Sequence, residues 1–134
     1  MAQVIVLDAS ALIALASSKD PHHSWAIEMF RDTAAFELQI TALTYAEILV
    51  HPARAGKLEK FQKGIGSLGL EITPVGHEDS AALAKLRAST SLKLPDVVVL
   101  NQALKTKGSI ASSDKDLLRI AREKGIGVFH PKKL

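Results

Sequence analysis

The sequence predicts an α/β protein in which a mainly parallel sheet is covered by helices on both faces. Two observations support this prediction. Short apolar runs alternate along the chain with longer stretches in which apolar residues recur every three or four positions, a pattern typical of strands joined by crossover helices. The strand-like runs are also bounded by Gly, Pro or polar turn residues, which end a strand sharply.

Five strands are expected. The clearest is the first, because residues 3–7 read QVIVL and combine apolar and β-branched side chains. Four shorter runs of the same kind follow. The predicted strands are 3–7, 37–40, 70–73, 109–112 and 127–129.

Seven helices are expected between and around these strands. Each has helical apolar spacing, and several begin with a polar capping residue or with Pro95. The predicted helices are 9–17, 22–33, 45–55, 58–67, 78–90, 95–106 and 115–124.

The composition excludes several classes of protein. The 134-residue chain is 47% hydrophobic and contains no cysteine, which rules out disulfides, thiolate nucleophiles and Cys-ligated zinc. Its longest apolar stretches are far below the roughly 20 residues of a membrane span, and the N-terminus lacks the pattern of a signal peptide. We therefore expect a single domain over residues 1–134, in the cytoplasm and with no membrane partner. The net charge of +3 permits an anionic partner.

One motif suggests nucleotide binding and is rejected. Gly64, Gly66 and Gly69 spell GxGxxG, which binds dinucleotides only where it follows a strand and opens a helix. Here a helical segment precedes the motif, and a strand that ends in proline follows it. We interpret GIGSLG as a turn from helix to strand.

Four acidic residues are the most informative feature of the chain. Asp8 ends the first strand, Asp114 follows the fourth, Asp96 is the second residue of the helix opened by Pro95, and Glu47 lies in the first turn of a helix that starts near Thr44. In a parallel α/β sheet, strand carboxyl ends and the starts of the following helices share one edge. The four acids are therefore expected to converge.

Taken singly, each acid has a simpler interpretation as a helix cap or as a partner of a helix dipole. Thr44 with Glu47 reads TxxE, the pattern of a capping box. Four carboxylates at one edge, however, repel one another unless a cation neutralises them. An all-oxygen site suits Mg²⁺ or Mn²⁺ better than Zn²⁺, and such ions promote phosphodiester hydrolysis. The spacing leaves open whether one metal or two would bind.

These segments also carry a family resemblance. The chain resembles PIN domains and, among them, the toxin half of VapBC-type toxin-antitoxin pairs. The matching segments span most of the chain: VIVLDASALIAL at 4–15, TALTYAEIL at 41–49, LPDVVVL at 94–100 and ASSDKDLL at 111–118.

The resemblance implies a three-layer α/β/α sandwich with a central, mainly parallel five-stranded sheet. It implies RNA cleavage with Mg²⁺ or Mn²⁺ and silencing by a cognate antitoxin. The positions it implies as metal-binding acids are Asp8, Glu47, Asp96 and Asp114. Ser10 and Ser112 would orient a carboxylate or a metal-bound water, and Asp116 would make an outer, water-mediated contact. The chain departs from the family pattern at Asn101 and Gln102, where small apolar residues are usual.

Other chemistries find less support. The five histidines show no HExxH or similar spacing, which argues against a zinc hydrolase. Ser10 and Ser112 lack a GxSxG elbow and an obvious histidine partner, which argues against a serine hydrolase. RNA contact would then depend on basic residues that bind phosphates. The candidates are Arg54, Lys57, Lys85, Arg87, Lys93 and Lys115.

The apolar positions on either side of Gly56 have two interpretations. They belong to the core, or they form a groove for a partner helix or a homodimer seam. These positions are Leu49, Val50, Leu58, Phe61 and Ile65. The toxin resemblance favours a homodimer whose groove also receives an antitoxin segment.

Two other functions remain open. One is a structure-specific DNA nuclease, since related acid clusters serve such enzymes. The other is a non-catalytic PIN-like RNA-binding module, which would be expected to have lost one or more of the acids. All four are present here.

Overall fold

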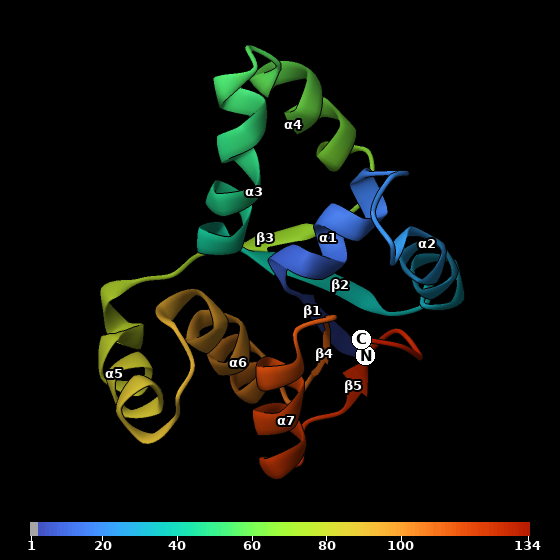
Figure 1. The fold of residues 1–134 in the computed structure, drawn as a ribbon. Coiled ribbons are helices and arrows are strands. Elements are labelled where there is room, and N and C mark those ends of the chain that lie inside the picture. Colours follow the sequence, from blue (N-terminus) through green and yellow to red (C-terminus); the bar gives the residue numbers. More distant parts are fainter. Residues whose placement is uncertain (1–2) are drawn as a thin grey trace.

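The computed structural model describes residues 3–134, and a five-stranded, all-parallel sheet lies at its centre (Figure 1). The strand order is β3-β2-β1-β4-β5. Each predicted strand is present, with its ends displaced by one residue at most. The strands are β1 (Val4–Leu7), β2 (Glu37–Thr41), β3 (Glu71–Thr73), β4 (Ser109–Ala111) and β5 (Val128–Phe129).

Helices cover both faces of the sheet, so the predicted three-layer α/β/α sandwich is confirmed (Figure 1). On one face lie α1 (Ala9–Ala16), α2 (His23–Asp32), α3 (Ala42–Arg54) and α4 (Leu58–Gly66). On the other lie α5 (Ser80–Ser89), α6 (Leu94–Thr106) and α7 (Lys115–Glu123), and a short 3-10 turn, η1 (His77–Asp79), leads into α5. In the part of the chain that the structure describes, no helix combines the length and apolar character needed to cross a membrane.

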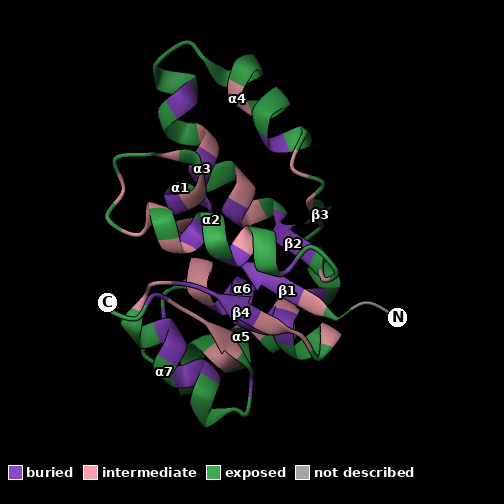
Figure 2. Cartoon of the chain, turned by 90° about the vertical axis from the view of Figure 1, so that its right-hand side faces the viewer, coloured by how far each residue is buried: buried purple, intermediate pink, exposed green. Residues whose placement is uncertain are grey.

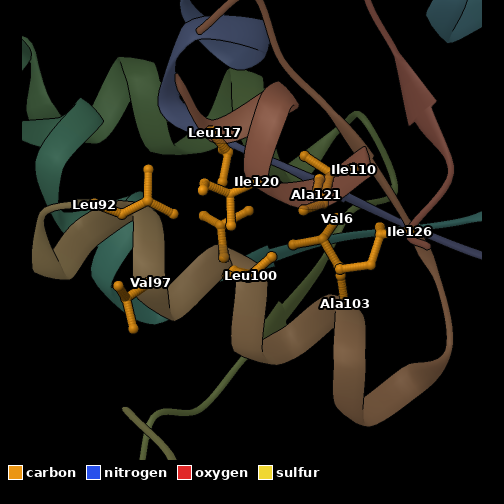
Figure 3. Close-up of a cluster of buried hydrophobic side chains, with 11 residues drawn as sticks. Val6, Leu92, Val97, Leu100, Ala103, Ile110, Leu117, Ile120, Ala121 and Ile126 are labelled. Atoms are coloured by element: carbon orange, nitrogen blue, oxygen red, sulfur yellow. The ribbon is translucent and has the colours of Figure 1, made fainter. Parts of the chain in front are cut away.

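The central strands are buried on both sides. Successive residues of a strand point to opposite faces, and in β1 Val6 joins the core beneath α6 and α7 while Ile5 and Leu7 join the core beneath α1 to α4. Figure 3 shows the first of these cores, in which Val6 and Ile110 of the sheet lie beside Leu100 and other side chains of the helices. Figure 2 shows the buried strands between helices whose outer sides are exposed. Burial on both faces explains why β1 reads as an unbroken apolar run.

The predicted capping box of Thr44 and Glu47 is wrong. Helix α3 follows β2 without a loop, and its N-cap is Thr41, whose Oγ1 accepts a hydrogen bond of 3.1 Å from the backbone N–H of Thr44. Thr44 is buried inside the helix, and Glu47, the sixth helical residue, lies in the second turn and not the first. The local TxxE pattern cannot indicate that a helix has already begun one turn earlier. Asp96 is likewise the third residue of α6, because Leu94 opens that helix.

The GIGSLG segment is confirmed as a turn from helix to strand. Gly64 and Gly66 belong to the end of α4, and Gly69 adopts a φ of +73° in the turn before β3. A positive φ is readily adopted only by glycine. The segment therefore lacks the strand-then-helix context that binds a dinucleotide phosphate.

The two unusual polar residues of α6 are accommodated without breaking the helix. Asn101 is buried, and the Gln102 side-chain N–H donates a hydrogen bond of 2.9 Å to Oε1 of Gln39 in β2. Gln39 is itself buried on the α6 side of the sheet and donates to Glu37 at 3.3 Å. A polar contact thus joins α6 to the sheet at a position where apolar packing is usual.

Candidate metal centre

The carboxyl edge of the sheet collects the predicted site residues because all five strands run in the same direction. Asp8 follows β1 directly and is the N-cap of α1. Its Oδ1 accepts hydrogen bonds from the Ser10 hydroxyl at 2.6 Å and from the Ala11 backbone N–H at 3.0 Å, and its Oδ2 accepts from the Ser112 hydroxyl at 2.5 Å. The carboxylate is thereby fixed in a buried position, and the residue is only 5% exposed.

The segment after β4 is tied to the segment after β1. Ser112 is fully buried, and its Oγ accepts a hydrogen bond of 2.9 Å from the Asp114 backbone N–H while its hydroxyl donates to Asp8. The Ser113 backbone N–H donates to Oγ of Ser10 at 3.0 Å. Each serine hydroxyl therefore connects two loops, and Asp8 and Asp114 are held at adjacent strand ends.

Asp114 is also a helix cap. Its Oδ1 accepts hydrogen bonds from the backbone N–H groups of Asp116 and Leu117, at 2.9 and 3.1 Å, at the start of α7. The capping interpretation of Asp8 and Asp114 is thus correct, but it does not exclude a metal site. An ionised carboxylate has about four acceptor positions, and the cap bonds use only some of them.

Electrostatics indicate that all four acids are near one another. The pKa of Asp96 is raised to about 6, first by burial and then by the negative charges of Asp114, Asp8 and Glu47, with Lys93 opposing the rise. Burial and then the charge of Asp8 raise the pKa of Glu47. The pKa of Asp8 is raised by its own burial, against the effect of its hydrogen bonds, with Asp114 adding to the rise. The four carboxylates therefore form one region of concentrated negative charge.

The donor set fits a hard divalent cation, because it consists of carboxylate oxygens without sulfur or imidazole ligands. As the side chains of residues 3–134 stand, no group of three or more His, Asp or Glu residues is arranged so that it could hold a metal ion. Like-charged carboxylates repel one another, so a cation would have to draw the four closer together. Asp8 and Asp114 are held in place by their cap bonds, which leaves Glu47 and Asp96 as the acids that would move.

The side chain of Asp116 pairs with a basic residue and with none of the four acids. Its side chain is exposed and pairs with Arg119 at 3.6 Å along the same helix. It is not among the charges that shift the pKa of Asp8, Glu47 or Asp96. Its predicted outer contact with a metal therefore stays a prediction.

One neighbour of the acids was not associated with them from the sequence. His51 lies one helical turn after Glu47 in α3, and both residues line a cavity between α1, α3 and α4. Residues four positions apart share a helix face, so this spacing was the available signal.

Parallel α/β domains bind their ligands outside the carboxyl ends of the strands, and this is the edge at which Asp8 and Asp114 lie. Residues 5–123 match the sequence model of the PIN domain, and the chain belongs to the PIN domain family. PIN domains are typically metal-dependent nucleases. No curated protein sequence matches the chain significantly.

Solved structures support the same fold at low sequence identity. A toxin-antitoxin complex from Klebsiella pneumoniae contains a chain that is 20% identical with a TM-score of 0.74, over 97% of this chain and 99% of that one. FitAcB from Neisseria gonorrhoeae is 17% identical with a TM-score of 0.75, over 97% and 99% of the two chains. VapC20 from Mycobacterium tuberculosis, described as a sarcin-ricin loop cleaving toxin, is 13% identical with a TM-score of 0.74, over 87% and 94%.

Proposed function

We propose that this protein is a metal-dependent endoribonuclease that hydrolyses RNA phosphodiester bonds, and that it is the toxin of a toxin-antitoxin pair. The observation that carries the proposal is the crowding of negative charge around Asp96. Its pKa is raised to about 6 because it is partly buried beside three other carboxylates. This excess of negative charge is what a divalent cation neutralises in a phosphate-processing site. The resemblance to VapC-type toxins supports RNA as the substrate, as does the net charge of +3.

The four acids have distinct roles in this proposal. Asp8, Glu47, Asp96 and Asp114 would hold Mg²⁺ or Mn²⁺, which when bound activates water and polarises a phosphoryl oxygen. The hydroxyls of Ser10 and Ser112 hold the Asp8 carboxylate in one orientation. Asp114 is the N-cap of α7, and backbone N–H groups at the start of that helix hold its carboxylate in turn.

An antitoxin partner is the second part of the proposal. Its support is the similarity to chains from toxin-antitoxin complexes, including one from Klebsiella pneumoniae and FitAB bound to a DNA fragment. Such a pair acts inside the cell, which agrees with the expected cytoplasmic location. Co-expression with the product of a neighbouring antitoxin-like gene should abolish the RNA cleavage. Retention of full activity in a purified complex of the two would contradict this part.

A homodimer remains a prediction. Of the positions proposed for a groove or seam, Ile65 is buried in the core and Phe61 packs against that core, whereas Val50 and Leu58 are 44% and 37% exposed. The core interpretation therefore holds for the first two, and a seam would have to use the exposed pair. Light scattering at high protein concentration tests the dimer, and a monomer would contradict it.

The nuclease is tested by incubating a mixed RNA pool with the purified protein in Mg²⁺, in Mn²⁺ and in EDTA. The variants Asp8→Asn and Asp96→Asn are assayed alongside, with Asp32→Asn as a matched control, because Asp32 is an exposed acid of α2 outside the cluster. Cleavage should require the metal and both acids and be unaffected in the control. Cleavage that continues in EDTA, or equally in all variants, would contradict a metal-dependent site formed by these acids.

A further inference from the structure

A cavity of 460 Å³ lies directly beside the acid cluster. It is formed between α1, α3 and α4, and Glu47 is part of its wall. Its volume is within the range of about 300 to 1,000 Å³ that small-ligand sites occupy. A group bound in this cavity would therefore lie next to one of the four acids.

The lining suits a flat, partly polar ring. Leu12, Ile13, Pro52 and Phe61 provide apolar and aromatic surface, and His51 adds a polar group at the wall that it shares with Glu47. Sequence-selective RNA-binding proteins bind unpaired bases in this way, stacking them on aromatic or apolar side chains and contacting their polar edges. His51 and Glu47 are the polar groups that such a ring edge would meet in the wall of the cavity.

The cavity has an acidic residue in its wall on one side and a basic residue on the other. Glu47 marks the end nearest the acids, whereas Lys57 lines the cavity on the α4 side. Lys57 also lines a second cavity of 640 Å³, together with Lys60, and Phe61 forms part of the wall of both. An RNA chain with one phosphate at the acid cluster would thus meet exposed lysines farther along the cavity. This arrangement favours a polyanion over a neutral partner.

We propose that this cavity binds an unpaired base of the RNA substrate, adjacent to the phosphodiester bond that is cleaved, and that Lys57 contacts a neighbouring phosphate. The inference rests on the proposed ribonuclease function and extends it to the choice of cleavage site. Phe61 and Ile13 form the walls against which the base packs. The competing occupant is an apolar segment of a partner protein, which would give neither the abasic sensitivity nor the fluorescence change measured below.

Ile13→Trp is the variant of choice, since it fills the cavity without disturbing the core. Ile13 is 47% exposed, so a larger side chain can occupy the cavity while the backbone of α1 stays in place. Leu104→Trp is the matched control: Leu104 is 40% exposed and lies near the end of α6, at the opposite edge of the sheet. Far-ultraviolet circular dichroism and thermal melting establish that both variants are folded.

The measurement is kcat/KM on a short single-stranded RNA with one cleavage site, and on versions in which each nucleotide around that site is made abasic in turn. For wild type and Leu104→Trp, one abasic position should lower kcat/KM by roughly tenfold or more, as expected when a stacked base is lost. Ile13→Trp should show about the same loss on the intact RNA and no further loss at that abasic position.

A second measurement does not depend on cleavage. Asp96→Asn is mixed with RNAs that carry the fluorescent base aminopurine at one position at a time. One of these RNAs should change its fluorescence on binding, and the change should disappear with the double variant Asp96→Asn/Ile13→Trp. Metal-dependent cleavage with no sensitive abasic position would overturn the base site and leave the nuclease intact. The same conclusion would follow if Ile13→Trp lowered kcat/KM relative to wild type by the same factor on every RNA, abasic or not. Absence of any cleavage by wild type would instead overturn the proposed function, and the fluorescence would still decide whether a base binds.

Discussion

The Ser112 hydroxyl donates a hydrogen bond of 2.5 Å to Oδ2 of Asp8, although 104 positions separate the two residues. The same oxygen of Ser112 accepts from the backbone N–H of Asp114. One buried side chain thus joins the ends of β1 and β4 and sets the spacing of two of the four acids. The contact shows which carboxylate Ser112 reaches, and its predicted positioning role in a metal site stays a prediction.

Ser112→Ala should therefore affect both stability and metal binding. Removal of the hydroxyl leaves the Asp114 N–H and one oxygen of Asp8 without a buried partner, which should lower the free energy of unfolding by about 1–3 kcal/mol. Mn²⁺ affinity, measured by calorimetry, should fall by roughly 10- to 100-fold. Ser10→Ala is the comparison, because Ser10 is only partly buried and should cost less. Equal and small effects in both variants would contradict the positioning role.

Asp96→Asn should stabilise the metal-free protein at neutral pH. The ionised carboxylate is held in a partly buried position near Asp114, Asp8 and Glu47. The amide removes that repulsion and should add about 1–2 kcal/mol, less than the full pKa shift implies because solvent screens a partly exposed group. Differential scanning calorimetry with EDTA measures this gain.

Added Mn²⁺ should reverse the order of the two proteins. Ligand binding to the folded state raises Tm, so Tm of wild type should rise while that of Asp96→Asn changes little. Asp32→Asn should behave like wild type throughout. A variant that loses stability in EDTA would show that Asp96 makes a favourable contact in the folded protein instead of suffering repulsion.

Gln102 and Gln39 should be energetically coupled. Gln102→Leu leaves Oε1 of the buried Gln39 without its donor, at a cost of about 1–3 kcal/mol. In the double variant Gln39→Leu/Gln102→Leu, two apolar side chains face each other, and part of that loss should be regained. Urea unfolding of the two single variants and the double variant gives the coupling energy. Strict additivity would mean that the hydrogen bond contributes nothing.

The ion pair between Asp79 and Lys105 predicts a pH-dependent stability. The Lys105 ammonium, 2.9 Å from Oδ1 of Asp79, and the Gly76 backbone N–H lower the pKa of Asp79 below its ordinary value of 3.8. A lowered folded-state pKa means that the stabilisation is present above 3.8 and is lost as pH falls through the folded pKa. Lys105→Met should thus be less stable than wild type at neutral pH.

This difference should shrink as the pH falls below the ordinary aspartate range, where Asp79 becomes protonated in both proteins. Chemical unfolding at a series of pH values measures the effect. Lys85→Met, which removes an exposed lysine of α5, should show no such convergence. A constant difference between Lys105→Met and wild type at all pH values would indicate that Lys105 stabilises through its aliphatic stem and not its charge.

The sequence by itself determined the strands and helices, and the edge of the sheet at which the acids lie. Apolar periodicity and turn residues are local properties, and they predicted each strand to within one residue. The parallel sheet then placed Asp8 and Asp114 together, because strands that run in one direction end at one edge. One local pattern misled: TxxE at Thr44 suggested a helix start one turn too late, because Thr41 caps the helix from the end of β2.

Tertiary structure alone decided how these elements meet. Hydrogen bonds between Ser112 and Asp8, or Gln102 and Gln39, join residues far apart in the sequence, and no local pattern encodes them. Packing of α1 and α4 against α3 likewise created the cavity that Glu47 shares with Phe61. Propensity and periodicity act over a few residues, whereas contacts between distant segments depend on how whole faces pack, so they appear only in the folded chain.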